Sequence, residues 1–91
     1  MTLPEFTTEI TSEFGPGYEA EEWGNGRLFA KKMLDGAPPQ MVSVSYQSGR
    51  WEVFSSYALW TRADTLAKAK AAHWAEMKER MKVLIREVKG D

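Results

Sequence analysis

Two short turn sequences in the middle of the chain limit its possible folds most strongly. Asn25-Gly26 and Ser48-Gly49 each separate stretches that contain aromatic and other apolar residues. Asn-Gly pairs readily adopt the positive φ angles of a type I′ turn, which connects two antiparallel strands. We therefore predict a β-hairpin around each turn and an antiparallel sheet in the middle of the chain.

The predicted sheet is a four-stranded meander. Its apolar residues alternate with polar ones, so that Val42, Val44 and Tyr46 share one face of the third strand. Trp51 and Val53 alternate in the same way on the fourth strand, and this shared face is predicted to carry the C-terminal helix. The strands are expected at residues 18–23, 27–34, 41–47 and 50–57.

Both ends of the chain are predicted to be helical. At the N-terminus, Thr2 and Glu5 fit a capping box, and Pro4 lies in the first turn, where its missing N–H costs nothing. Threonines and the spacing of apolar residues also fit a strand here, so a strand is the alternative for residues 2–14. Residues 62–89 are predicted to form one long helix, because residues 66–89 contain neither glycine nor proline.

The C-terminal helix is predicted to be longer than the sheet on which it packs. Thr61 and Asp64 resemble a capping box at its start. The helix would be ~42 Å long at ~1.5 Å per residue, whereas a six-residue strand spans ~20 Å. Its far end is therefore expected to project and to contact the N-terminal helix, a partner or a second copy. The apolar face of the helix is predicted from its 3–4 spacing to contain Ala63, Ala67, Trp74, Met77, Met81, Leu84 and Val88.

We name the last four of these residues (Met77, Met81, Leu84 and Val88) the association stripe.

The whole chain, residues 1–91, is expected to be a single α+β domain: a short N-terminal helix, the meander and the long helix packed on the sheet. The absence of cysteine excludes disulfides and cysteine-based metal sites. No apolar run reaches the length of a membrane span and no signal peptide is evident, so a cytoplasmic protein without membrane contact is expected.

No motif in the sequence indicates an enzyme. His73 is the only histidine; Glu76 at i+3 could orient it as a general base, but a lone helical histidine is more often a packed or surface residue. Glu19 and Glu21 project from the opposite strand face to Glu22, which argues against a carboxylate metal site. We therefore expect no catalytic residues, no cofactor and no metal.

Charge is distributed unevenly along the chain. Residues 1–26 contain six glutamates and no lysine or arginine, whereas residues 27–91 contain all twelve basic residues and seven acidic ones. This split indicates a dipolar surface and a charged partner, although two solvated faces of one fold would also explain it. The acidic region expected to bind a protein partner consists of Glu5, Glu9, Glu13, Glu19 and Glu21.

Direct nucleic-acid binding is the alternative function. The sheet face opposite the long helix is expected to carry Phe54 and either Phe29 or Leu28, depending on register. We expect the N-terminal helix to cover this face as a second layer of core. If it stays open, its rings would stack nucleobases, with help from basic residues of the C-terminal helix. The alternative nucleic-acid face consists of Lys31, Lys32 and Arg50.

In general character the chain resembles small proteins encoded by phages and mobile elements, anti-CRISPR proteins among them. The shared features are a short cysteine-free domain, the meander-plus-helix layout, an acid-rich first 26 residues and the lack of catalytic residues. The resemblance covers the whole chain, rests on no specific motif and carries over no functional residues. It implies a stoichiometric inhibitor of a nucleoprotein complex. The leading hypothesis is thus a non-enzymatic protein–protein interaction protein whose acidic region occupies a basic groove of its partner. Homodimerisation through the association stripe is a further expectation.

Overall fold

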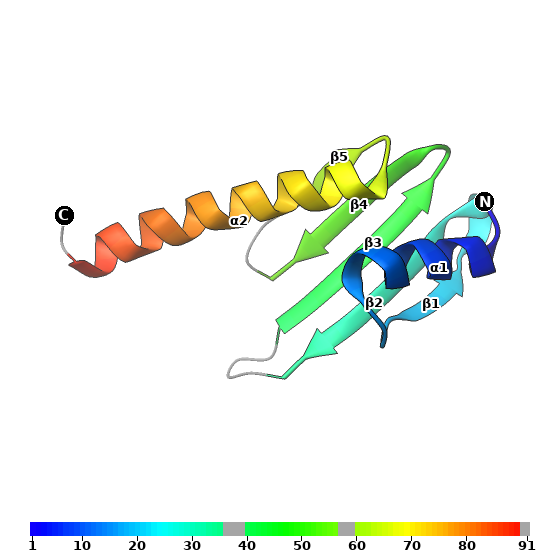
Figure 1. Cartoon of the computed structure of the whole chain (residues 1–91), viewed down its shortest axis with the longest axis horizontal. Helices are drawn as coiled ribbons and strands as arrows, with labels where there is room; N and C mark the ends of the chain where they lie inside the picture. Colours follow the sequence, from blue (N-terminus) through cyan, green and yellow to red (C-terminus); the bar gives the residue numbers. More distant parts are fainter. Residues whose placement is uncertain (36–39, 57–59, 90–91) are drawn as a thin grey trace.

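The computed structural model has a helix at each end of the chain and a five-stranded antiparallel sheet between them (Figure 1). It describes residues 1–35, 40–56 and 60–89. The strands lie side by side in chain order, which confirms the α+β class and the meander but adds a fifth strand. The elements are α1 (Leu3–Phe14), β1 (Glu19–Glu22), the 3₁₀ turn η1 (Gly24–Gly26), β2 (Leu28–Leu34), β3 (Gln40–Gln47), β4 (Arg50–Ser55), β5 (Thr61–Ala63) and α2 (Leu66–Lys89).

Helix α1 begins at the predicted capping box. The Thr2 hydroxyl accepts a hydrogen bond from the backbone N–H of Glu5 at 3.3 Å, and the Glu5 carboxylate accepts one from the backbone N–H of Thr2 at 3.4 Å. The helix ends at Gly15, whose φ of 87° suits glycine and whose N–H donates to the Thr11 carbonyl. Helix, not strand, is therefore the correct alternative for this segment.

Both predicted hairpin turns are confirmed. Each residue of Asn25-Gly26 and Ser48-Gly49 has a positive φ, between 51° and 79°. Gln47 pairs with Arg50 across the second turn, so that turn contains two residues and fixes the register of β3 against β4. Residues 36–39, between the second and third predicted strands, and the end of the fourth predicted strand at residue 57 lie outside the described residues.

Strand β5 was not predicted. The sequence suggests Thr61 as the cap of α2, and this is wrong: Thr61 pairs with Val53 of β4, and α2 begins at Leu66. The helix is capped by Thr65 instead, whose hydroxyl accepts a hydrogen bond from the backbone N–H of Lys68 at 3.2 Å. A strand of three residues is too short to show the alternation by which strands are recognised.

Both helices pack on the same face of the sheet (Figure 1). The prediction that α1 covers the opposite face is therefore wrong. Helix α2 contacts β4 and β5 and leaves the apolar residues of β2 and β3 on this face to be covered. Helix α1 covers them, and its Phe6 ring stacks on Trp51 with the ring centroids 5.6 Å apart. The shared core contains Phe6, Ile10, Leu28, Ala30, Val44, Trp51, Val53, Leu66 and Ala69.

The buried face of α2 differs in phase from the prediction. Leu66, Ala69 and His73 are buried against the sheet, whereas Ala67 and Trp74 are exposed. Alanines are frequent in the first turns of this helix and fit either phase, so the pattern alone does not choose between them.

The predicted mismatch in length is confirmed. Helix α2 has 24 residues, which makes it ~36 Å long at ~1.5 Å per residue. Its C-terminal half extends beyond the sheet (Figure 1), and the molecule measures 49 Å along its longest axis. No helix in the described part of the chain is long and apolar enough to cross a membrane.

Candidate interaction surface

The sheet face turned away from both helices, which we call the open face, carries exposed side chains such as Lys31, Arg50 and Arg62, while Ser43 and Ser45 at its centre are buried. Among the described elements, neither helix packs on it. Strand register places Phe29, Ser45, Glu52 and Arg62 opposite one another across four strands, and alternation puts them on this face. The neighbouring row consists of Lys31, Ser43 and Phe54.

Two aromatic pairs lie on the open face, one on each side of β3. The Trp23 and Phe29 rings stack with their centroids 4.6 Å apart, and the Phe54 and Trp60 rings meet at 5.1 Å. Trp23 and Trp60 remain 42% and 45% exposed. Between the pairs lies the small side chain of Ser45 on β3, which is buried. Each pair therefore offers a wide apolar surface to a binding partner.

Three arginines gather beside these rings. Arg27, Arg50 and Arg62 line a hollow of about 590 Å³, which we call the arginine hollow. Arg62 forms an ion pair with Glu52, with Nε and Oε1 3.2 Å apart, and the guanidinium of Arg27 lies 5.3 Å from the Trp23 ring centroid. With three guanidinium groups and one carboxylate, the hollow suits an anionic group.

The alternative nucleic-acid residues are not all brought together. Lys31 and Arg50 lie on the open face, but Lys32 lies on the helix side of the sheet. There its ammonium donates a hydrogen bond to the Pro16 carbonyl at 3.0 Å and lies 5.8 Å from the Tyr18 ring centroid. Lys32 therefore joins β2 to the loop after α1.

The acidic residues of α1 partly serve the fold itself. Glu5 belongs to the capping box, and the Glu13 carboxylate lies 3.7 Å from the ammonium of Lys70 on α2. Lys70 also donates a hydrogen bond to the Glu13 carbonyl. These contacts join α1 to α2, while Glu9 is an exposed carboxylate on the same helix.

The remaining acidic residues lie on the other side of the molecule. Glu19 and Glu21 share the open face of β1 with Lys31 and Phe29, their register partners on β2. Glu21 accepts a hydrogen bond from the Trp23 indole N–H at 2.7 Å and so holds that ring in place. The acidic region is thus divided between the two sides of the sheet.

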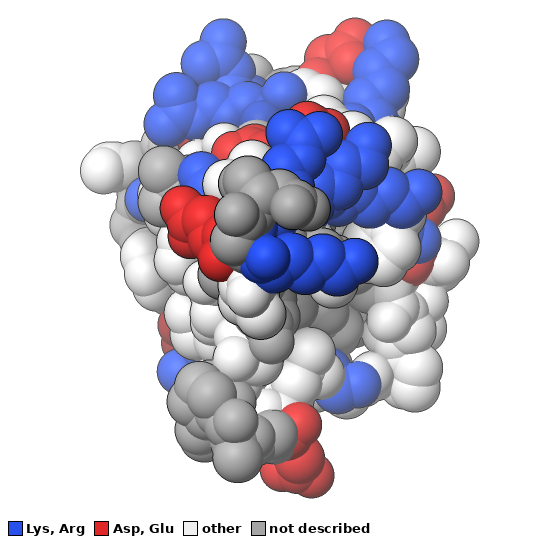
Figure 2. All heavy atoms as spheres, turned by 90° about the vertical axis from the view of Figure 1, so that its left-hand side faces the viewer, with Lys and Arg blue, Asp and Glu red and all other residues white. Residues whose placement is uncertain are grey.

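The projecting end of α2 carries many basic side chains, which surround it in Figure 2. Two of them are paired along the helix: Arg80 with Glu76 at 3.2 Å and Lys82 with Glu79 at 3.7 Å. Such pairs of opposite charge are typical of a solvated helix face.

The association stripe continues the buried face of α2 into solvent. Met77 is half-buried, whereas Met81 and Val88 are 55% and 81% exposed. The side chain of Leu84 lies outside the described residues.

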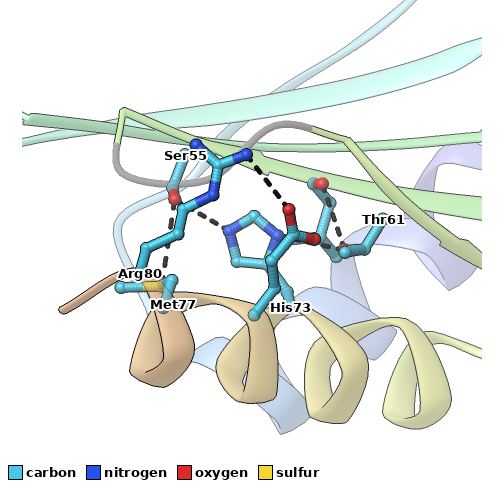
Figure 3. A network of polar contacts seen from close by, with 7 residues as sticks. Ser55, Thr61, His73, Met77 and Arg80 are labelled. Carbon is cyan, nitrogen blue, oxygen red and sulfur yellow. Dashed lines mark hydrogen bonds and ion pairs between the residues drawn. The ribbon is translucent and has the colours of Figure 1, made fainter. Parts of the chain in front are cut away.

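His73 belongs to a buried polar trio between α2 and the sheet (Figure 3). Its Nε2 lies 2.7 Å from the Ser55 hydroxyl, and its Nδ1 lies 3.0 Å from the Thr61 hydroxyl. Thr61 is positioned to donate its single hydroxyl proton to the carbonyl of Val53 or Ala69, both at 3.3 Å. The arrangement is satisfied when Nδ1–H donates to Thr61 and Nε2 accepts from Ser55, which is a neutral imidazole.

Burial lowers the pKa of His73, while the nearby Glu76 carboxylate raises it by a smaller amount. In a catalytic triad the partner of the histidine is a carboxylate, which balances the charge of the imidazolium. Here Thr61 stands in that place, and its hydroxyl cannot do so. We interpret the trio as the polar part of the core, in agreement with the interpretation of His73 as a packed residue. Within the described ranges, no group of three or more His, Asp or Glu side chains is placed to hold a metal ion.

Sequence reasoning missed Arg27, Trp60 and Arg62. A signal for the first was present, because Arg27 and Phe29 are two residues apart and therefore share a strand face. Trp60 and Arg62 have the same spacing, but residue 62 was placed in the predicted helix 62–89 and Trp60 lay outside every predicted element. Comparisons with protein-family models, curated proteins and solved structures found no match to this chain.

Proposed function

We propose that this chain is a non-enzymatic protein-binding domain whose contact surface is the open face. The observation that carries the proposal is the arginine hollow flanked by two half-exposed tryptophans, Trp23 and Trp60, on a sheet face that neither helix covers. Tryptophan and arginine are the residues that most often dominate the binding energy of protein interfaces.

The partner expected at this surface presents acidic side chains next to apolar ones. Carboxylates would form bidentate hydrogen bonds with Arg27 and Arg50, and apolar side chains would pack on the two aromatic pairs. Arg62 already has a carboxylate partner in Glu52, so it would share its guanidinium or exchange partners. This surface differs from the acidic region favoured by sequence alone, because Glu5 and Glu13 already have intramolecular contacts.

A protein fits the open face better than a nucleic acid does. The chain has a net charge of −1, whereas nucleic-acid-binding domains are commonly strongly basic. Glu19, Glu21 and Glu52 lie on the same face and would repel a phosphate backbone. Protein interfaces accept such mixed charges because they can present either sign opposite each group.

The inhibitory role implied by the resemblance to phage-encoded proteins stays a prediction, as do the cytoplasmic location and the nucleoprotein nature of the partner. Self-association through the association stripe is an independent proposal, supported by the exposure of Met81 and Val88 on the continuation of the buried helix face.

The proposal is tested by capture of partners from cell lysate on immobilised protein, with and without nuclease. Arg50→Glu and Trp60→Ala should each lower recovery of a stoichiometric protein partner at least tenfold, since both alter the open face. Lys68→Glu is the matched control: it reverses one exposed charge on α2 and should leave recovery unchanged.

Two results would contradict the proposal. Partner recovery that survives Arg50→Glu and Trp60→Ala but is lost with Glu9→Lys would place the interface on α1. Recovery of nucleic acid, with proteins lost after nuclease, would assign the open face to nucleic-acid binding. Folding of each variant is checked by circular dichroism, so that loss of binding is not mistaken for unfolding.

A further inference from the structure

A second hollow lies on the opposite side of the sheet, between α2 and the strands β3 and β4. It has a volume of about 310 Å³ and is lined by Val42 and Val53 from the sheet, by Met77 and Trp74 from α2 and by Phe14 from the end of α1. This volume falls within the range of small-molecule sites, at its lower limit. We call it the apolar cavity.

The polar groups at its wall are already engaged. The hydroxyl of Ser55 and the ring of His73 are hydrogen-bonded to each other at 2.7 Å. The Ser56 hydroxyl accepts a hydrogen bond from the backbone N–H of Met41, and the ammonium of Lys70 is held by Glu13. Gln40, which also lines the cavity, has an interaction of its own.

The hollow is partly open to solvent, and water inside it gains few hydrogen bonds from a wall whose polar groups are already engaged. An apolar molecule would displace this water and make dispersion contacts with the lining. Met77 adds adaptability, since its unbranched thioether can adjust to the shape of an occupant. Burial lowers the pKa of His73, so the wall offers no positive charge from the ring to an anion at neutral pH.

We propose that the apolar cavity binds a small, neutral, apolar molecule of one to three rings or a short aliphatic chain. The proposal is independent of the open face, because the β-sheet separates the two sites.

The test uses the full chain and two fluorescent probes that differ by one charged group. N-phenyl-1-naphthylamine is neutral, and 1-anilinonaphthalene-8-sulfonate is the same ring system with a sulfonate. The neutral probe should bind saturably with one site per chain and at least tenfold more tightly than the sulfonate. Trp74, 57% exposed at the cavity wall, should transfer excitation energy to the bound probe.

Variants locate the probe. Val42→Phe and Met77→Phe each add a ring to the cavity wall and should weaken binding of the neutral probe at least tenfold. Two variants are used so that the test survives if one of them fails to fold. Arg50→Glu, on the other side of the sheet, is the control and should leave binding unchanged.

Three results would overturn the proposal: no saturable binding to the folded protein, equal binding of the two probes, or binding unaffected by the folded cavity variants. The measurement is repeated at low and high protein concentration. If fewer probe molecules bind per chain at high protein concentration, a second copy of the chain fills the cavity. This result would also overturn the assignment to a small molecule.

Discussion

Acid should destabilise this protein through one residue, His73. Its ring is 5% exposed and bound on both nitrogens by hydroxyl groups, and burial lowers its pKa below the usual value of about 6.5. In the unfolded chain the same ring takes up a proton at its usual pKa. Between these two values the unfolded state binds more protons than the folded state, so the free energy of unfolding falls as the pH falls.

The size of the effect follows from this proton difference. The contribution of His73 to the free energy of unfolding should be nearly constant above pH 7.5. It should then decrease by at most about 1.4 kcal/mol for each pH unit below about 6.5, until the pH reaches the pKa of the folded state. At pH 5.5 the loss due to His73 is therefore at most about 1.4 kcal/mol. The Glu76 carboxylate raises the pKa of His73 and therefore reduces this loss of stability. Its ion pair with Arg80 weakens this effect of Glu76.

The assay is urea unfolding followed by tryptophan fluorescence at several pH values from 7.5 to 5.5. His73→Gln serves as the reference, because an amide can still bond with Ser55 and Thr61 but does not titrate. The difference between the two proteins isolates the histidine from the carboxylates, which titrate alike in both. Parallel curves for the two proteins, or a wild type that gains stability on acidification, would show that His73 does not cause the loss of stability. If His73→Gln does not fold, a wild-type curve that is flat over this range would show the same.

Three further predictions concern packing, backbone and association. Phe6→Ala should lower the free energy of unfolding by about 3–5 kcal/mol, because Phe6 is fully buried; a loss below 1 kcal/mol in urea unfolding would contradict the described core. Gly49→Ala should lower the free energy of unfolding by about 1–3 kcal/mol, because φ is 79° at this position. Gly24→Ala should lower it less, because Gly24 has no positive φ and the new Cβ would meet no atom within 4 Å. Equal shifts of the melting temperature in the two variants would contradict this turn geometry. Met81→Glu with Val88→Glu should abolish self-association in light scattering at high concentration, and a strictly monomeric wild type would count against the association stripe.

The features that local chemistry determines were predictable from sequence. Thr2 and Glu5 form a capping box because they are three residues apart at a helix start, and Asn25-Gly26 turns because both residues accept positive φ. In each case the deciding interaction lies within a few residues, so no knowledge of the rest of the fold is needed.

The features that depend on distant contacts were not predictable. Whether α1 covers one sheet face or the other depends on how much of the face α2 leaves uncovered, and Phe6 meets Trp51 across 45 residues of chain. The arginine hollow has the same origin, because Arg27, Arg50 and Arg62 become neighbours only when β2, β4 and β5 pair through the meander. The apolar cavity likewise depends on which face of α2 packs on the sheet, and the alanines of this helix fit more than one choice.

The location of the interface is tested most directly by protection of single cysteines, since the chain has none of its own. Gln47→Cys places a thiol at the wall of the arginine hollow, and Glu9→Cys places one on the exposed side of α1. The rate of maleimide labelling is measured for each variant, free and bound to the captured partner. We expect the partner to slow labelling at position 47 at least tenfold and to leave labelling at position 9 unchanged. Protection at position 9 with free labelling at position 47 would contradict this expectation.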